Sequence, residues 1–595
     1  MTTHSAGGVR WDLKELFASH DDPRITAKLT DTRQRAEAFA HRFRPIVASP
    51  EQLTAVILLE GLRELETIYE GLGRVTSFAG LLYAEDTANP DYQDLEQKVE
   101  QQSTEIRNLL LFFELEWLKL DDGTAQKLMA DPLLQGYRHY LASLRRYRPH
   151  TLTEPEEKVI SEKDNTGRNA FARLFSEITS SLNFAVQKDG RELDLNLSQV
   201  LSLLHEPDRD LRRRAMDSLY RVLAQNGQTL AFVYDTLIQD HLTMDRLRHY
   251  ADPMAPRHLA NEIDPEAVKI MMRATEDNYG LAQAYFCQKA KLMGLPTLAL
   301  HDQYAPVGLR DQPFPYEQAK TVILDAFEAF DPSFRSIASE FFAANWIDAE
   351  IRKGKRGGAF CASPSPLLHP YILCNYSDNL RDVMTVAHEL GHGLHGCLSR
   401  GQSYFNYDTP LTTAETASVF GEMLVFDHLY ERQSDPQARV ALLAGKIEDT
   451  LATVFRQNVL TRFEESAFSA RQVKRLTPDA LGRLWLEENR KYYGDAVDLP
   501  QGYRWGWSYI PHFIHSRFYC YSYVFGQLLV LALYRMYKQQ GKAFVPKYVA
   551  LLAAGGSDSP ETLLRPLGVD LRDPRFWQQG FAEIASLVTR LQEAV

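Results

Sequence analysis

Cysteine is scarce in this chain, and the cysteines that occur follow no recognisable pattern. The 595 residues contain five cysteines, at positions 287, 361, 374, 397 and 520, and no CxxC pair. An extracellular disulfide framework is built from an even set of cysteines, whereas this set is odd and scattered. We therefore expect reduced thiols in a cytoplasmic protein.

Long hydrophobic runs and basic stripes are also missing. The opening MTTHSAGGVRWDL lacks the apolar core of an export signal, and the most apolar late run, Val524 to Tyr534, is too short to span a bilayer. The chain has 66 Lys and Arg against 78 Asp and Glu, a formal net charge of −12, and no Lys/Arg-rich stripe. We therefore expect neither a membrane nor nucleic acid as a partner.

Few segments alternate apolar and polar residues as β-strands do. Apolar residues spaced as on one face of a helix are much more common. Hydrophobic residues make up 45% of the chain, enough for a large core. Leu58, Leu62, Leu65, Tyr69 and Leu72 recur at steps of three and four residues, which places them on one face of a helix. The sequence therefore predicts a mostly α protein.

Two short segments predict β structure. Residues 183–186 and 192–195 flank the turn signal Lys188-Asp189-Gly190 and favour a hairpin. A second strand is expected over residues 370–376. Pro207 and the acidic residues beside it begin a new helix after the hairpin, so we place a boundary near residue 200, with domains over 1–200 and 201–595.

Residues 388–392 read His-Glu-Leu-Gly-His, and the preceding residues are compatible with a helix. Residues four apart on a helix differ by about 40° around its axis and about 6 Å along it. Both His388 and His392 can therefore bind one metal ion, while Glu389 lies beside them to take a proton from a metal-bound water. With 17 histidines in the chain, a chance match has a probability of about 3%.

The third metal ligand has three candidates. Leu398 stands where a metzincin would carry histidine, which excludes that class, and His395 lies about 10 Å beyond His388 along the axis, too far to share an ion. Glu415 and Glu422 follow in a predicted helix over 412–422 and, being two turns apart, share a face. One could bind the metal while the other orients an imidazole, and the spacing does not distinguish them.

Several further motifs bear a family resemblance. Together with the zinc motif, they resemble the oligoendopeptidase F branch of the thimet oligopeptidase (M3) metallopeptidases, over about residues 10–585. The matching segments are Trp11-Asp12-Leu13, Arg356 to Phe360, His369 to Tyr376, His388 to His395, Ala414 to Ser418, and Ile510 to Phe513 with the tyrosines at 519, 521 and 523.

The resemblance implies the rest of the site. Glu415 would complete a site for one zinc ion, and Glu422 would lie behind a ligand. His512, Tyr519 and Tyr523 would face the scissile carbonyl, with Tyr521 as an alternative to either tyrosine. The first domain would be of the oligoendopeptidase F type and the second the metallopeptidase domain.

The resemblance also implies a fold and a mode of substrate binding. The fold would be a helical ellipsoid with a deep central channel, which admits flexible peptides. The small β elements would lie beside the zinc site. The strand at 370–376 would be an edge strand that pairs with the substrate backbone.

The predicted function is therefore a zinc-dependent endopeptidase that hydrolyses short, unfolded peptides by metal-activated water. Two alternatives stay open. One is a metallo-exopeptidase that removes residues from a terminus. The other is a catalytically silent peptide-binding protein with a structural metal, although structural zinc sites usually fill all four positions with protein ligands. The sequence does not decide between a monomer and a homo-oligomer.

Overall fold

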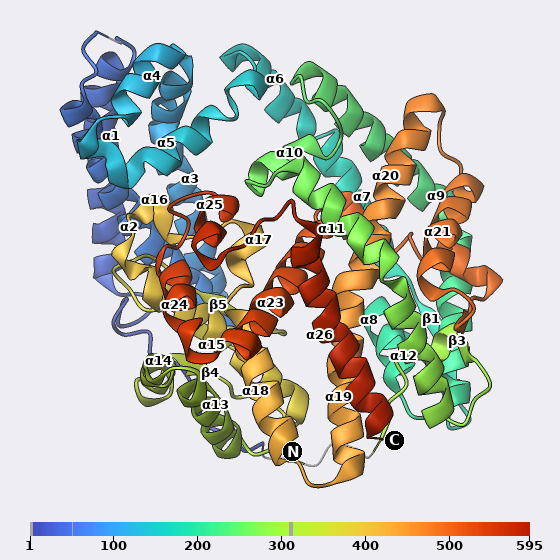
Figure 1. Cartoon of the computed structure of the whole chain (residues 1–595). Coiled ribbons are helices and arrows are strands. Elements are labelled where there is room, and N and C mark those ends of the chain that lie inside the picture. Colours follow the sequence, from blue (N-terminus) through green and yellow to red (C-terminus); the bar gives the residue numbers. More distant parts are fainter. Residues whose placement is uncertain (1–3, 50, 309–312, 595) are drawn as a thin grey trace. The chain divides into compact units, whose positions relative to one another are not determined.

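The structure is a computed structural model that describes residues 4–49, 51–308 and 313–594 (Figure 1). Helices account for 71% of the chain and strands for 4%, which confirms the mostly α class. The chain forms two compact units, each assembled from three segments. Unit 1 comprises residues 1–148, 311–432 and 536–569, and unit 2 comprises 149–310, 433–535 and 570–595. The sequence-based boundary near residue 200 is a different division and stays a prediction.

Unit 1 is helical apart from three short strands. Its elements are α1 (Pro23–Val47), α2 (Ala55–Glu85), α3 (Pro90–Lys119), α4 (Asp122–Met129), η1 (Pro132–Tyr137), α5 (Arg138–Arg145), α13 (Tyr316–Phe330), α14 (Pro332–Ala343), β4 (Ile347–Asp348), β5 (Phe360–Ala362), β6 (Tyr371–Leu373), α15 (Leu380–Leu398), η5 (Ser399–Gly401), α16 (Tyr404–Tyr407), α17 (Leu411–Ala414), α18 (Ser418–Arg432), η8 (Gly541–Ala543), α24 (Val545–Ala553), α25 (Pro560–Leu564) and η9 (Arg565–Leu567). Two elements, η2 (Arg148–His150) and α23 (Tyr521–Gln540), run from one unit into the other.

The first three helices of unit 1 pack together around one apolar core (Figure 1). The stripe predicted from the sequence is the buried face of α2, where Leu58, Leu62, Leu65 and Leu72 are each at most 2% exposed and Tyr69 is partly buried. The side chain of Thr54 caps this helix by accepting a hydrogen bond from the N–H of Ile57. The predicted helix face is therefore confirmed.

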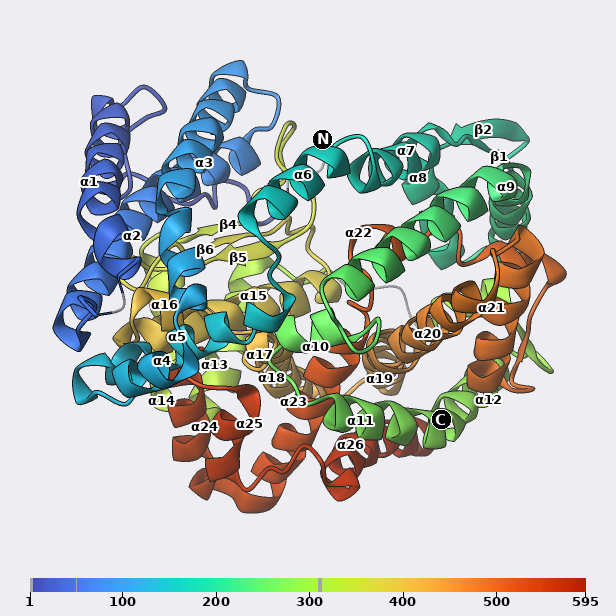
Figure 2. The same cartoon turned by 90° about the horizontal axis from the view of Figure 1, so that it is seen from above.

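The three strands of unit 1 form one small sheet in the order β4-β6-β5, with β4 parallel and β5 antiparallel to β6 (Figure 2). A strand forms where residues 370–376 predict one, but its placement at the edge is wrong, because β6 has a neighbour on both sides. Its three residues, Tyr371, Ile372 and Leu373, are fully buried. An unbroken apolar run of this kind is typical of a central strand. The edge strands are β4 and β5, and β5 also contacts α15.

Unit 2 contains the remaining elements. They are α6 (Glu154–Asp164), α7 (Arg168–Ser181), β1 (Phe184–Lys188), β2 (Arg191–Leu195), α8 (Leu197–Ser202), η3 (Leu203–His205), α9 (Arg209–Leu247), α10 (Ala255–Ala260), α11 (Pro265–Asp277), α12 (Tyr279–Leu292), β3 (Leu298–Ala299), η4 (Leu300–Asp302), α19 (Pro436–Leu451), the π-helical turn η6 (Ala452–Arg456), α20 (Gln457–Val473), α21 (Pro478–Tyr493), β7 (Val497–Asp498), η7 (Gln501–Trp505), α22 (His512–His515) and α26 (Pro574–Glu593).

The predicted hairpin is present in unit 2. β1 and β2 pair antiparallel, with Lys188 opposite Arg191, and Asp189 and Gly190 form the turn with positive φ angles of 51° and 75°. Positive φ at both central residues matches the twist of a two-residue hairpin, and Asp-Gly adopts it readily. The local sequence therefore specifies this element by itself.

Two expectations about the chain as a whole can be compared with the structure. All five cysteines are free thiols. Within the described ranges, no helix combines the length and the apolar character needed to cross a bilayer.

Candidate metal and active site

Both histidines of the zinc motif lie on α15, a helix whose start is fixed by its own sequence. The side chain of Asn379 accepts a hydrogen bond from the N–H of Asp382 at 2.9 Å and so caps the helix. Val383, Val386 and Leu390 are buried along it. The apolar residues therefore fix the orientation of the helix within unit 1, and with it the direction of His388 and His392.

A glycine lets the chain around Glu415 approach this helix closely. A Cβ atom placed on Gly391 would lie 2.4 Å from Cα of Ser418 and 2.5 Å from the carbonyl oxygen of Ala417. No side chain fits at such distances, so only glycine permits this packing of α15 against the start of α18. The close approach brings the two histidines and Glu415 to one place.

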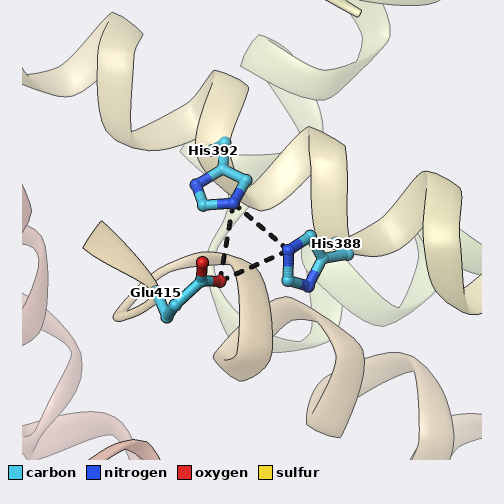
Figure 3. Close-up of side chains that lie close together, drawn as sticks. All are labelled: His388, His392 and Glu415. Atoms are coloured by element: carbon cyan, nitrogen blue, oxygen red, sulfur yellow. Dashed lines mark hydrogen bonds and ion pairs between the residues drawn. The ribbon is translucent and has the colours of Figure 1, made fainter. Parts of the chain in front are cut away.

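His388, His392 and Glu415 point toward one another (Figure 3). The two Nε2 atoms are 3.2 Å apart, and Oε2 of Glu415 lies 3.3 Å from Nε2 of His388 and 3.5 Å from Nε2 of His392. Ligand atoms about 2 Å from a tetrahedral ion are about 3.3 Å apart. The donor set and its spacing therefore fit a zinc ion.

The two glutamates of the predicted helix have different positions. Oε1 of Glu422 accepts a hydrogen bond from Nδ1–H of His388 at 2.6 Å, on the side of the ring away from the cluster. Oε2 of Glu415 accepts one from the hydroxyl of Ser418 at 2.6 Å. The structure thus places Glu415 with the two histidines and Glu422 behind one of them.

The expectation of one helix over 412–422 is wrong. α17 ends at Ala414 and α18 begins at Ser418, so Glu415 lies in the turn between them, while Glu422 is inside α18. The turn is closed by the N–H of Thr416, which donates to the carbonyl of Thr413 at 3.1 Å. The chain leaves the helical path where it packs against Gly391, and this break directs the carboxylate of Glu415 to the histidines.

Burial and charge shift the pKa values of the motif residues. Burial raises the pKa of Glu389 to about 7, with the charges of Glu415 and Glu422 adding to this and that of His388 opposing it. Burial alone would lower the pKa of His388, but the hydrogen bond and charge of Glu422, with Glu415 and Glu389, raise it to about 9. Glu389 is only 6% exposed, which suits a base that works beside a water molecule.

A cavity of about 650 Å³ opens over this cluster, and residues of unit 1 line it. Its walls contain His388, Glu389, His392 and Glu415, the β5 residues Phe360 and Cys361, and residues of 404–409. His395 also lines it but lies outside the metal cluster, in agreement with its position along the helix, and burial lowers its pKa to about 4. The cavity and the free edge of β5 thus adjoin the metal ligands.

The predicted carbonyl-facing residues gather in unit 2. The hydroxyl of Tyr523 lies 3.5 Å from Nε2 of His512, and the ring of Tyr519 lies 5.8 Å from that of His512 and 5.1 Å from that of Tyr523. Tyr521 differs, because it is fully buried and its hydroxyl is held by Asn261 at 2.9 Å and by His258 at 3.0 Å. The hydroxyl of Tyr521 is therefore bonded inside unit 2, whereas the rings of Tyr519 and Tyr523 lie beside His512.

Two residues of the cavity wall were not found from the sequence. Tyr407 and Asp408 line the same space as the metal ligands, yet neither stands in a recognisable motif. An isolated Tyr-Asp pair is common, so only the fold reveals their position.

Comparison with known proteins places this geometry in a family. Residues 202–583 match the family model described as Peptidase family M3, and residues 116–184 match one described as Oligopeptidase F. The chain belongs to peptidase family M3. The matched region contains the metal cluster, Glu389 and Glu422, as well as His512 and both tyrosines.

Individual relatives span nearly the whole chain. Oligopeptidase PepF of Bacillus subtilis is 26% identical over 552 residues, covering 90% of this chain and 82% of its own. Group B oligopeptidase PepB of Streptococcus agalactiae is 26% identical over 600 residues, covering 100% and 98%. These names describe the two relatives as oligopeptidases.

Solved structures share the fold. A crystal structure from Chlamydophila abortus has a TM-score of 0.87 at 22% identity and covers 98% of each chain. That of oligoendopeptidase-F from Enterococcus faecium has a TM-score of 0.71 at 23% identity, covering 96% of this chain and 97% of its own. The helical architecture is thus that of the oligoendopeptidase F structures.

Proposed function

We propose that this M3 peptidase is a zinc-dependent endopeptidase that hydrolyses internal bonds of short, unfolded oligopeptides. One observation carries the proposal: three ligand atoms spaced for a tetrahedral ion, from His388, His392 and Glu415, lie in one cavity with the buried carboxyl of Glu389. The names of the relatives agree with oligopeptides as substrates.

The protein residues supply three of the four ligands that zinc usually takes. Zinc bound there would lower the pKa of a water molecule in the remaining position toward neutrality. A fourth protein ligand is absent from the cluster within the described residues. This favours a catalytic site over a structural one, in which protein residues usually occupy all four positions.

Glu389 is the proton carrier of the proposed reaction. Its carboxylate accepts the proton of the attacking water and passes it to the nitrogen of the leaving amine, so no covalent acyl-enzyme is formed. Glu422 holds the ring of His388 by its Nδ1–H, which keeps Nε2 directed into the cluster. In this proposal Glu389 transfers the proton and Glu422 orients the metal ligand His388.

The edge of β5 offers a place for the substrate backbone. Among the described residues β6 is the one strand that pairs with β5, and Phe360 and Cys361 of β5 line the cavity. An extended peptide can add to such an edge by main-chain hydrogen bonds, which favours unfolded substrates and tolerates varied side chains. This assigns to β5 the pairing that the sequence suggested for 370–376.

His512, Tyr519 and Tyr523 are the proposed donors to the carbonyl oxygen as it gains charge. Hydroxyl and imidazole N–H groups at such an oxygen stabilise the transition state more than the ground state. The three side chains already lie together in unit 2, with the hydroxyl of Tyr523 near His512.

Digestion of peptides of about ten residues, blocked at both ends, tests the proposal. The zinc-loaded protein should cleave them internally, and a chelator should stop cleavage until zinc is restored. Product masses identify the bond broken. Blocked peptides that stay intact while unblocked ones lose terminal residues would instead identify an exopeptidase. Binding without any cleavage would identify the silent peptide-binding protein.

A further inference from the structure

A short turn of unit 2 connects two of the residues proposed to act on the substrate carbonyl. The 516–518 turn consists of Ser516, Arg517 and Phe518 and lies between His512 and Tyr519. The N–H of Ser516 donates to the carbonyl oxygen of His512 at 3.0 Å, and the N–H of Tyr519 donates to the carbonyl oxygen of Ser516 at 3.2 Å. The backbones of His512 and Tyr519 are therefore both tied to the turn.

Phe518 has a backbone conformation that a bulky residue rarely adopts. Its φ is 52°, in the left-handed region. Its ring packs against that of Phe468 on α20, with the centroids 5.0 Å apart. Such a conformation persists only where the surrounding structure determines it, and it is typical of functional sites. The residues that hold the 516–518 turn in place are therefore of interest for the reaction.

The buried carboxyl of Glu464 contacts the turn directly. The residue lies on α20 and is 0% exposed, and its Oε1 accepts a hydrogen bond from the N–H of Phe518 at 2.9 Å. Among the described residues its Oε2 has no hydrogen-bond partner. Burial raises the pKa of Glu464 to about 8, although the N–H of Phe518 and the charges of Arg257 and Arg517 oppose the rise. The carboxyl is therefore mostly protonated at pH 7.

The fold gains little stability from a carboxyl at this place. Burial of a polar group costs free energy unless hydrogen bonds replace those to water. Only one of the two oxygens of Glu464 has such a bond within the described chain, and the nearby Arg517 forms its ion pair with Asp245 instead. Among the described residues, the bond to the 516–518 turn is thus the one interaction that accounts for a carboxyl here.

Two arginines hold the rest of the turn. Arg517 forms a bidentate ion pair with Asp245 of α9, in which Nη1 lies 2.6 Å from Oδ2. Arg257 of α10 donates from Nη2 to the hydroxyl of Ser516 at 2.9 Å, and its guanidinium lies 5.5 Å from the centre of the Tyr519 ring. A cation over the face of an aromatic ring is attracted to it. Arg257 therefore contacts both the turn and the ring of Tyr519.

We propose that Glu464 and Arg257 are positioning residues of the peptidase reaction. Glu464 fixes the backbone of the 516–518 turn, and Arg257 fixes the ring of Tyr519. Neither has to touch the substrate, because both act by keeping His512 and Tyr519 in the directions that the developing charge on the carbonyl oxygen requires. This proposal rests on the proposed function, which assigns the carbonyl to these two residues.

Two substitutions separate the hydrogen bond of Glu464 from its size. Glu464→Gln keeps an oxygen for the N–H of Phe518 and is uncharged like the neutral acid, so kcat on blocked peptides should stay within about threefold of the wild type. Glu464→Met is similar in size but has no oxygen acceptor, and kcat should fall about tenfold or more with the KM and zinc content of the wild type. An unchanged kcat in Glu464→Met would overturn the role of Glu464.

A double-mutant cycle shows whether Glu464 acts through Tyr519. Tyr519→Phe removes the hydroxyl that the turn positions. Glu464→Met should therefore lower kcat by a smaller factor in the Tyr519→Phe background than in the wild type, because residues that act as a unit are not additive. Equal factors in the two backgrounds would refute positioning through Tyr519 and identify a structural role.

Leu587→Ala is the control for lost stability. Leu587 is 0% exposed in α26, which packs on α11, α12 and α19 of the same unit. The cavity left by this substitution should lower the melting temperature. Measured well below that temperature, kcat should stay at the wild-type value. A loss of kcat in Leu587→Ala equal to that in Glu464→Met would overturn the proposal, because lost stability would then explain both.

Arg257→Met tests the second residue, and it also tests the turn if Glu464→Met does not fold. Arg257 is only half-buried, so its loss should be tolerated, and kcat should fall about tenfold or more at unchanged KM. A wild-type kcat would refute its role. Cleavage of blocked peptides by the wild type reports the proposed function itself. Peptides that stay intact would overturn that function, whereas wild-type cleavage with unchanged kcat in the variants would overturn the positioning alone.

Discussion

The carboxylate of Glu422 accepts a hydrogen bond from Nδ1–H of His388 at 2.6 Å, while Nε2 of the same ring lies 3.3 Å from Oε2 of Glu415. One imidazole therefore links the two glutamates, one on each side. This arrangement holds the ring against rotation and leaves Nε2 free for a metal ion.

Replacing either glutamate should separate its role from that of the other. Glu422→Ala should lower the zinc affinity by about 10- to 100-fold, because the orienting partner of His388 is lost. Glu415→Ala removes a ligand and should cost more. Competition with a chromogenic chelator measures both affinities. The reverse order of the two losses would exchange the roles.

Replacing the proposed base should abolish turnover and keep the metal. Glu389→Gln has nearly the same shape but cannot accept a proton. We expect kcat to fall at least about 10²- to 10⁴-fold, with the zinc content of the wild type. Peptide cleavage and metal content are measured on the same sample. Normal cleavage by this variant would contradict the assignment.

Enlarging Gly391 should damage the metal site from a distance. In Gly391→Ala the new Cβ meets backbone atoms of residues 417 and 418, so α15 and α18 must separate. We expect a loss of about 1–3 kcal/mol in the free energy of unfolding, with weaker zinc binding.

Gly80→Ala in α2 is the matched control for this substitution. A Cβ atom there meets nothing within 4 Å, so alanine should stabilise the helix by about 0.5–1 kcal/mol. If both variants unfold and bind zinc like the wild type, the close approach at Gly391 does not matter.

The three late tyrosines should respond differently to loss of the hydroxyl. Tyr519→Phe and Tyr523→Phe should lower kcat by up to about 10²- to 10³-fold if they stabilise the carbonyl oxygen. Tyr521→Phe should instead lower the melting temperature with a smaller effect on kcat, because its hydroxyl is bonded to Asn261 and His258 inside unit 2. A large loss of kcat in Tyr521→Phe alone would refute this division.

His258 should make the stability depend on pH. Burial lowers the pKa of His258 to about 4 from the ordinary histidine value of 6.5, so the folded protein holds it neutral. Between these values the unfolded chain binds a proton that the folded chain does not, and stability falls as the pH is lowered. The contribution of His258 at pH 5 should be about 2 kcal/mol less than at pH 7.

Urea unfolding at the two pH values measures this effect. His258→Gln should be less stable than the wild type at pH 7, because a buried contact to Tyr521 changes, but its stability should fall less between pH 7 and pH 5. An equal fall in both proteins would show that His258 does not carry the dependence.

The sequence by itself determined the features that depend on neighbouring residues. The spacing of His388 and His392 places both rings on one side of a helix wherever that helix lies, since helical geometry is local. The leucine stripe of α2 and the Asp189-Gly190 turn follow for the same reason. Helical periodicity was enough for the mostly α class.

The tertiary structure alone decided which distant groups meet. The spacing of Glu415 and Glu422 left their roles open, and only the packing of Ala417 and Ser418 against Gly391 separates them. Likewise the order of the strands placed β6 between β4 and β5, and the contacts of the Tyr521 hydroxyl inside unit 2 set it apart from Tyr519 and Tyr523. These outcomes depend on contacts between segments far apart in the chain, which no local spacing specifies.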